Sequence, residues 1–115
     1  MPESANAQIR LAVATRADHL CEYCLIGEDD TFFGCQIDHI ISRKHGGETE
    51  TDNLAYACAF CNRHKGSDLA SLSERSGALV RLFNPRKDRW ADHFQLRGLS
   101  IQPLTEIGEV TTRIL

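Results

Sequence analysis

Four cysteines form two pairs whose spacing suits a metal ion. Two residues lie within each pair and 33 residues lie between the pairs, which are Cys21-Cys24 and Cys58-Cys61. Two thiolates three positions apart both reach one tetrahedral zinc ion at Zn–S distances of about 2.3 Å. Two such pairs complete a closed site with no open position, so we expect a structural zinc. Four buried thiols without metal are the competing interpretation.

The fifth cysteine, Cys35, lies in an apolar segment without a basic neighbour that would activate its thiol. We interpret it as a small buried hydrophobic residue. An odd number of cysteines, with no N-terminal secretory signal, is not typical of a disulfide framework. The zinc is therefore the expected cross-link, and such a site contributes on the order of 10 kcal/mol to folding.

Oxygen and imidazole donors lie between the cysteine pairs and just after them. Hydrolysis of a phosphodiester needs an activated water and compensation of charge on the phosphate. Asp38 offers a carboxylate and Asn62 an amide oxygen, the ligand type that Mg²⁺ prefers. His39 follows Asp38 directly and titrates near neutral pH, which suits a general base.

Taken together, these motifs resemble the HNH endonucleases, which carry a ββα-metal active site, also called a His-Me finger. The resemblance covers residues 21–66 closely, and residues 82–86 resemble part of one bacterial branch of that family. It implies that Asp38 and Asn62 hold a catalytic Mg²⁺ or Mn²⁺ and that His39 is the general base. It also implies that Asn53, the middle residue of the motif, holds the loop through hydrogen bonds. The motifs are Asp38-His39-Ile40, Gly46-Gly47, Asn53-Leu54 and Cys58-Ala-Phe-Cys61-Asn62-Arg63-His64-Lys65-Gly66.

Helical spacing favours Asn62 over His64 as the third ligand. If a helix begins near Cys61, Asn62 and Lys65 share a face, whereas His64 points about 160° away from Asn62. We therefore expect Lys65 to contact phosphate, with His64 as the alternative ligand or a further DNA contact. Adjacent strand residues point to opposite faces, so Asp38 and His39 meet one phosphate only if the strand twists or ends there. Arg43 and Lys44 are either further phosphate contacts or ordinary loop charge.

The expected architecture is a small zinc-stapled α+β domain. Residues 1–115 are expected to be a single domain, with an HNH core at about 21–66 and a C-terminal extension at 67–115. Helical spacing predicts a helix over 7–20, and β-branched and aromatic residues predict a strand over 32–41. Trp90, His93 and Phe94 are expected to pack the extension against the core. The remaining predictions are helices over 61–66 and 68–76, a strand over 78–83, and a short helix or extended segment over 89–96.

Charge is uneven along the chain, although the net charge of the 115 residues is only −3. Residues 1–30 hold two arginines and six acids, whereas residues 75–97 hold six basic residues and two acids. The basic segment either forms a local phosphate-binding face or is scattered surface charge. No apolar run reaches the ~20 residues of a membrane span, and with no secretory signal we expect a cytoplasmic protein.

The function expected from these residues is metal-dependent hydrolysis of DNA. One general base would nick one strand, so a double-strand break would need a homodimer, a partner protein or two encounters. The alternative is a non-catalytic zinc module that binds nucleic acid or protein and needs only the cysteines. Hydrolysis of RNA would use the same residues, and only the resemblance favours DNA.

Overall fold

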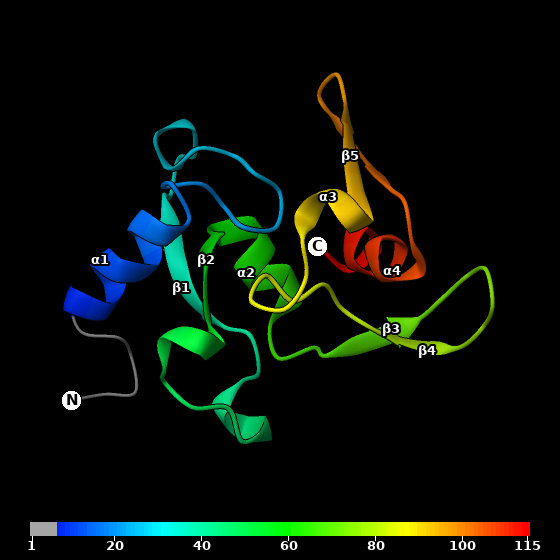
Figure 1. The fold of residues 1–115 in the computed structure, drawn as a ribbon, viewed down its shortest axis with the longest axis horizontal. Coiled ribbons are helices and arrows are strands. Elements are labelled where there is room, and N and C mark those ends of the chain that lie inside the picture. Colours follow the sequence, from blue (N-terminus) through cyan, green and yellow to red (C-terminus); the bar gives the residue numbers. More distant parts are fainter. Residues whose placement is uncertain (1–6) are drawn as a thin grey trace.

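A β-hairpin followed directly by a helix is the centre of the half of the molecule that holds the motifs described above (Figure 1). The computed structural model describes residues 7–115. The two strands are antiparallel, with Cys35 opposite Cys58 and His39 opposite Leu54. The expected small mixed α/β architecture is thus confirmed. The elements of this half are α1 (Ala7–Arg16), β1 (Cys35–His39), β2 (Leu54–Cys58) and α2 (Ala59–Lys65), with single 3₁₀ turns η1 (Glu28–Asp30), η2 (Arg43–His45) and η3 (Thr51–Asn53).

The second half is built from two further hairpins and a C-terminal helix. Each hairpin is a separate two-stranded sheet. Helix α4 contacts β3, β4 and β6, and the β5–β6 hairpin projects away from the rest of the molecule (Figure 1). The elements are β3 (Ala70–Leu72), β4 (Leu79–Arg81), α3 (Trp90–His93), β5 (Phe94–Arg97), β6 (Ser100–Pro103) and α4 (Glu106–Ile114).

One core joins the two halves, because aromatic residues of the second half pack against the first. The Phe83 ring lies 5.2 Å from the Phe94 ring and 6.0 Å from the His93 ring, centroid to centroid. Trp90 packs against Phe94, and its indole N–H donates to the Tyr23 carbonyl at 2.9 Å. The predicted packing of Trp90, His93 and Phe94 against the core is therefore confirmed. Fully or almost fully buried members of this core include Val13, Tyr23, Leu54, Ala55, Tyr56, Phe83 and Phe94.

Helix α1 ends at Arg16, so the prediction that it continues to residue 20 is wrong. Asp18 and His19 have φ values of 56° and 58°, which no right-handed helix contains. The Arg16 guanidinium donates to the carbonyls of Thr51 at 3.0 Å and Leu54 at 2.6 Å. The end of α1 is therefore attached to the segment that leads into β2.

The prediction of a helix over 68–76 is also wrong, because β3 and the turn after it occupy this stretch. The Ser73 hydroxyl lies 2.8 Å from a Glu106 carboxylate oxygen and 2.9 Å from one of Glu109. The Arg75 amide donates to the same hydroxyl, and Gly77 has a φ of 75°. These bonds of Ser73 replace helical ones, and the turn lets β3 pair with β4.

Two predicted strands are shorter in the structure, and one predicted helix is longer. Strand β1 covers residues 35–39 rather than 32–41, which leaves Phe32 92% and Phe33 66% exposed. Strand β4 covers residues 79–81 rather than 78–83. Helix α2 begins at Ala59, two residues before the predicted start, because Cys58 caps its N-terminus.

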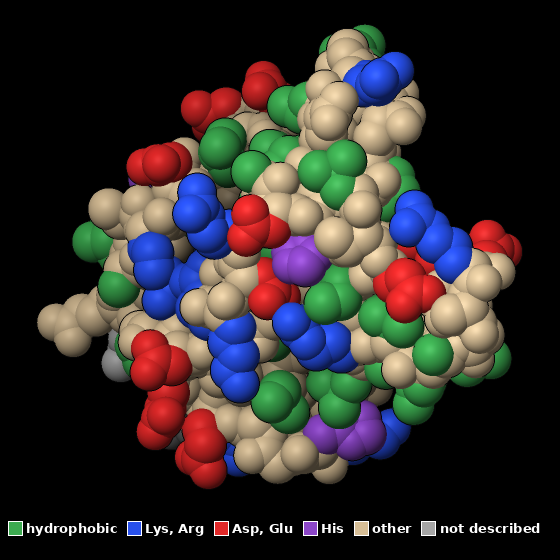
Figure 2. Space-filling model, turned by 45° about the vertical axis from the view of Figure 1, so that its right-hand side comes forward, with side chains coloured by type: hydrophobic (Ala, Val, Ile, Leu, Met, Phe, Trp, Pro, Cys, Tyr) green, Lys and Arg blue, Asp and Glu red, His purple; other side chains and the backbone are tan. Residues whose placement is uncertain are grey.

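Lys and Arg side chains lie near one another on one face of the molecule. Asp and Glu side chains lie both between them and around them (Figure 2). Among residues 7–115, no helix has the length and apolar character needed to cross a membrane.

Replacement of Gly108 should destabilise the attachment of α4. A Cβ atom at this position would lie 2.2 Å from the His93 carbonyl oxygen, a backbone atom that cannot move alone. We expect Gly108→Ala to lower the free energy of unfolding by about 1–3 kcal/mol, measured by urea denaturation. Thr112→Ala, at an exposed position of the same helix, should change it by less than about 0.5 kcal/mol. Equal stability of the two variants would contradict this packing.

Candidate active site and metal centre

The four paired cysteines meet in one cluster. Their Sγ atoms all lie within 4.8 Å of one another, and those of Cys24 and Cys58 are 3.8 Å apart. A tetrahedron with Zn–S bonds of about 2.3 Å has S···S edges of about 3.8 Å. The Cys24 amide donates to Cys21 Sγ and the Cys61 amide to Cys58 Sγ, which turns each pair toward the cluster. The donor set and its spacing fit a structural zinc ion.

The thiols of the cluster share their protons unevenly. Hydrogen bonds from the Cys24 and Cys61 thiols lower the pKa of Cys21 to about 2, and the same contacts raise the pKa of Cys24 to about 12 and that of Cys61 as well. A thiolate is the form that binds zinc, so a bound metal would have to displace the protons of Cys24 and Cys61. Cys35 differs, because burial raises the pKa of its thiol to about 12 and it lies outside the cluster. This agrees with its interpretation as a small buried hydrophobic residue.

Asp38 points into the protein interior and is 4% exposed. One carboxylate oxygen accepts from the Tyr23 hydroxyl at 2.8 Å, and the Lys65 ammonium lies 3.3 Å from both oxygens. Burial raises the pKa of Asp38, and the charge of Lys65 opposes that rise. Lys65 is itself 2% exposed and also donates to the His39 carbonyl at 3.1 Å. The structure thus places Lys65 beside the predicted catalytic pair, in the interior rather than toward solvent.

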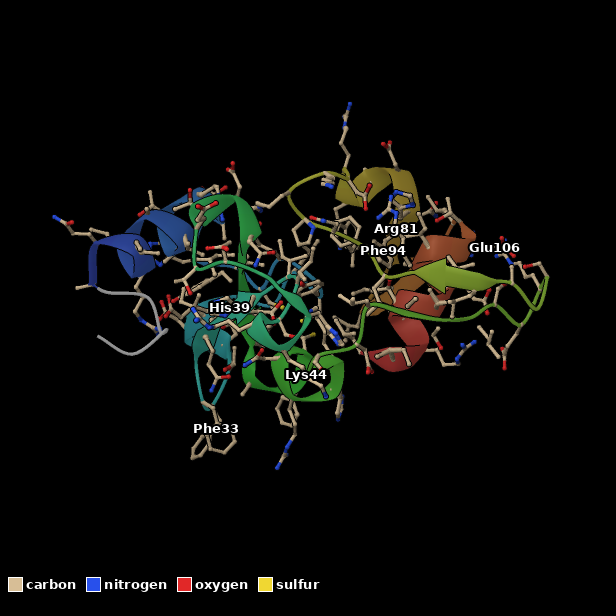
Figure 3. The ribbon with its side chains drawn as sticks, turned by 90° about the horizontal axis from the view of Figure 1, so that it is seen from below. Phe33, His39, Lys44, Arg81, Phe94 and Glu106 are labelled. Carbon is tan, nitrogen blue, oxygen red and sulfur yellow. The ribbon has the colours of Figure 1, made fainter. Side chains whose placement is uncertain are left out.

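His39 ends strand β1 and is half-buried, with its ring in the hairpin half of the molecule (Figure 3). Its Nε2 lies 2.9 Å from the Thr49 hydroxyl. Arg43 Nη1 donates to the same hydroxyl at 3.4 Å. The strand therefore does end at the residue where the chemistry required it to end or twist. His39 and Asp38 contact different groups, namely the loop and the interior.

Asn53 fixes the loop that follows His39. Its amide oxygen accepts from the Ile41 N–H, and its amide nitrogen donates to the carbonyls of Ile41 and Glu48, each at 2.9 Å. Gly47 completes this arrangement, because a Cβ there would lie 1.7 Å from the Ile41 oxygen. The hydrogen bonds are those of a residue that holds a loop, which is the contact pattern expected for Asn53.

Asn62 and Lys65 share the face of α2 that meets β1, as their spacing indicated. They contact different residues of that strand: the Asn62 amide donates to the Gln36 side chain at 2.6 Å, whereas Lys65 contacts Asp38. Within residues 7–115, no hydrogen bond joins Asn62 to Asp38. His64 lies elsewhere, with Nδ1 3.3 Å from the Leu115 carbonyl.

Three residues at the site were absent from the sequence-based prediction. Gln36 precedes Asp38 by two positions, so strand alternation puts it on the same face, and this signal was available. Tyr23 lies between two cysteines of the cluster, and nothing in the spacing indicates that its hydroxyl reaches Asp38. Thr49 lies in the long connection between β1 and β2, where contacts depend on the course of the loop.

Loss of zinc should unfold the protein. We expect one zinc per chain by elemental analysis, and a fall in the melting temperature when a chelator removes it. Cys58→Ser should lose the metal, whereas Cys35→Ala should retain it, since Cys35 is equally buried but outside the cluster. Metal-free protein with an unchanged melting temperature would contradict a structural role for the site.

Removal of the Lys65 ammonium should be costly, because it leaves the Asp38 carboxylate buried without a countercharge. We expect Lys65→Met to lower the free energy of unfolding by about 3–5 kcal/mol. Arg63→Met, at an exposed position of the same helix, should cost less than about 0.5 kcal/mol. The double variant Asp38→Asn with Lys65→Met should recover part of the loss. A Lys65→Met protein as stable as Arg63→Met would show that the pair is not a stabilising contact.

Comparison with known proteins shows which family the region around the cysteine cluster and His39 resembles. Residues 21–68 match the model of the HNH endonuclease family. The CRISPR-associated endonuclease Cas9 of Corynebacterium diphtheriae is 29% identical over 87 residues, which make up 75% of this chain and 6% of that protein. The chain thus spans only a small part of this relative's length. No solved structure matches the chain. Residues 21–68, which hold the cysteine cluster and the hairpin with His39, therefore belong to the HNH endonuclease family.

Proposed function

We propose that the protein is a metal-dependent endonuclease that hydrolyses DNA phosphodiester bonds and nicks one strand per active site. The observation that carries this proposal is the position of His39. His39 is the last residue of β1, and its imidazole is partly exposed. A contact between Nε2 and the Thr49 hydroxyl orients the ring. Among residues 7–115, no hydrogen bond engages its Nδ1. Family membership and similarity to a protein named as an endonuclease support the same activity.

In this proposal His39 is the general base. Nδ1 takes a proton from the water that attacks phosphorus, and the Thr49 contact at Nε2 keeps the ring in place during the transfer. The Asn53 hydrogen bonds hold the loop beside His39 and so maintain its distance from the substrate. Arg43 and Lys44, in the turn just after this strand, would balance phosphate charge.

Asp38 and Asn62 would hold the catalytic cation. Their oxygen donors suit Mg²⁺ or Mn²⁺, and the Asn62 amide donates through nitrogen to Gln36, so its oxygen is available. A bound cation would neutralise charge on the phosphate and assist departure of the leaving oxygen. Asp38 now pairs with Lys65, so metal binding requires this carboxylate to exchange the ammonium for the cation.

The same ion pair favours a second function, a zinc module that binds nucleic acid without cutting it. In that case the Asp38–Lys65 pair is only a structural contact of the interior, and the cysteine cluster alone maintains the fold. The two functions differ in what His39 does, since only the nuclease requires its imidazole.

Plasmid relaxation separates them. We expect wild-type protein to convert supercoiled plasmid to nicked circles with Mg²⁺ or Mn²⁺ at low salt. His39→Ala should reduce the rate by about 10²–10⁴-fold, the usual contribution of a general base. His19→Ala is the matched control, because His19 is exposed and pairs with Glu28. Equal rates for wild type and His39→Ala would contradict the proposed base. Absence of nicking by zinc-loaded wild type would favour the zinc module.

A further inference from the structure

A basic cleft lies where α1, η3 and the segment before α3 come together. Its volume is about 640 Å³, and its lining consists of Arg16, Asp52, Pro85, Arg86 and Lys87. Three of these side chains are cationic and one is acidic. No aromatic ring lines the cleft, so it offers a nucleobase no stacking surface, whereas guanidinium and ammonium groups are the usual partners of phosphate.

Among residues 7–115, two nitrogen atoms of the Arg86 guanidinium have no hydrogen-bond partner. One terminal nitrogen pairs with the Glu22 carboxylate, but Nε and the other terminal nitrogen are buried and have no hydrogen-bond partner. Buried donors without acceptors cost free energy, so the native protein gains if an acceptor reaches them. A phosphate in the cleft would meet the positive charge of Arg86, which lines it, and would accept from these buried nitrogens only after the guanidinium turned toward the cleft.

Neither of the other two cations has a tight carboxylate partner. The Arg16 guanidinium donates its hydrogen bonds to the neutral carbonyls of Thr51 and Leu54. Burial and the nearby charge of Arg86 lower the pKa of Arg16, and the carboxylates of Glu22 and Asp52 oppose that shift. Lys87 is exposed, and within the described chain its ammonium makes no ion pair. An anion would relieve the repulsion between these groups.

The cleft shares one lining residue, Lys87, with a groove beside the end of β1. Lys87 also lines a second groove of about 330 Å³, together with Ile40, Ile41 and Lys65. Ile40 and Ile41 directly follow His39, so Lys87 lies between the end of β1 and the basic cleft.

We propose that this cleft binds a backbone phosphate of the DNA strand that flanks the cleavage site, through Lys87 and Arg86. The inference rests on the proposed function, because it takes DNA as the substrate. It assigns a role to the basic C-terminal segment: that segment supplies the affinity that a chain with a net charge of −3 otherwise lacks.

Binding rather than cleavage tests the proposal. The probe is a fluorescently labelled 20-bp DNA duplex, with anisotropy measured at several salt concentrations and without added divalent ion. Lys87→Gln should weaken binding by about fivefold or more at low salt. It should also reduce the slope of log K against log salt by about 0.9, the value for one lost phosphate contact. Arg97→Gln makes the same charge change on the projecting β5–β6 hairpin and should alter binding by less than twofold.

The outcomes keep the cleft distinct from the nuclease. An unchanged affinity and salt slope for Lys87→Gln, an equal loss for Arg97→Gln, or wild-type protein that does not bind the duplex would each overturn the cleft. A loss of affinity for Lys87→Gln but not for Arg97→Gln supports the cleft even if the protein does not nick plasmid. That combination would support the binding site and contradict the proposed nuclease activity. Nicking that depends on His39, with Lys87→Gln binding like wild type, would leave the nuclease standing without this site.

Discussion

Cys58 ends strand β2, caps helix α2 and contributes its sulfur to the four-cysteine cluster, so three structural tasks fall on one side chain. The other end of the cluster belongs to residues 21–24, which run alongside β2: the Glu22 amide donates to the Tyr56 carbonyl, and the Glu22 carboxylate accepts from the Tyr56 amide. The position of α2 relative to the hairpin follows from these contacts. A small core would hold a seven-residue helix poorly, and a metal ion held by the four cysteines would supply a further constraint.

The placement of α2 determines what the hairpin can present to a substrate. Its last turn brings the Lys65 ammonium to the Asp38 carboxylate and to the carbonyl of His39. A cation of the protein's own thus sits beside the carboxylate expected to hold a metal. Because both groups are almost fully buried, the exchange of one cation for another carries a cost that an exposed carboxylate would not have. The cysteine cluster and the pair Asp38 and His39 are therefore linked through one short helix.

The sequence predicted the local parts of this arrangement well. Cysteine spacing and the shared face of Asn62 and Lys65 depend on periodicity and ligand geometry, which are visible in a single sequence. The pairing of β1 with β2 was implied by the family resemblance instead. Which residues of β1 contact α2 depends on the offset between helix and strand, and in the structure these residues are Gln36 and Asp38. That offset is set by the cluster and the packing, so it could not be derived from periodicity.

The C-terminal half was harder to predict for a related reason. Ser73 bonds to the distant Glu106 and Glu109, and this tertiary contact converts a stretch of helix-forming residues into a hairpin. Helix α4 was not predicted at all, because Pro103 and Gly108 are typical helix breakers. Thr105 caps it by accepting from the Gly108 amide, and the missing side chain of Gly108 lets the helix approach the His93 carbonyl. Propensity alone gives the wrong answer where a close approach requires glycine.

The contacts of Arg16 with the carbonyls of Thr51 and Leu54 have a consequence for how such a protein can diversify. Carbonyl groups are present whatever the side chain, so the anchorage of α1 does not restrict which residues occupy the exposed positions of η3. Asn53 similarly holds the backbone of Ile41 and Glu48 rather than their side chains. The loop between β1 and β2 is thus fixed in shape but free in much of its sequence. Substitutions in this loop can change its exposed side chains without changing the backbone hydrogen bonds that hold the loop beside His39.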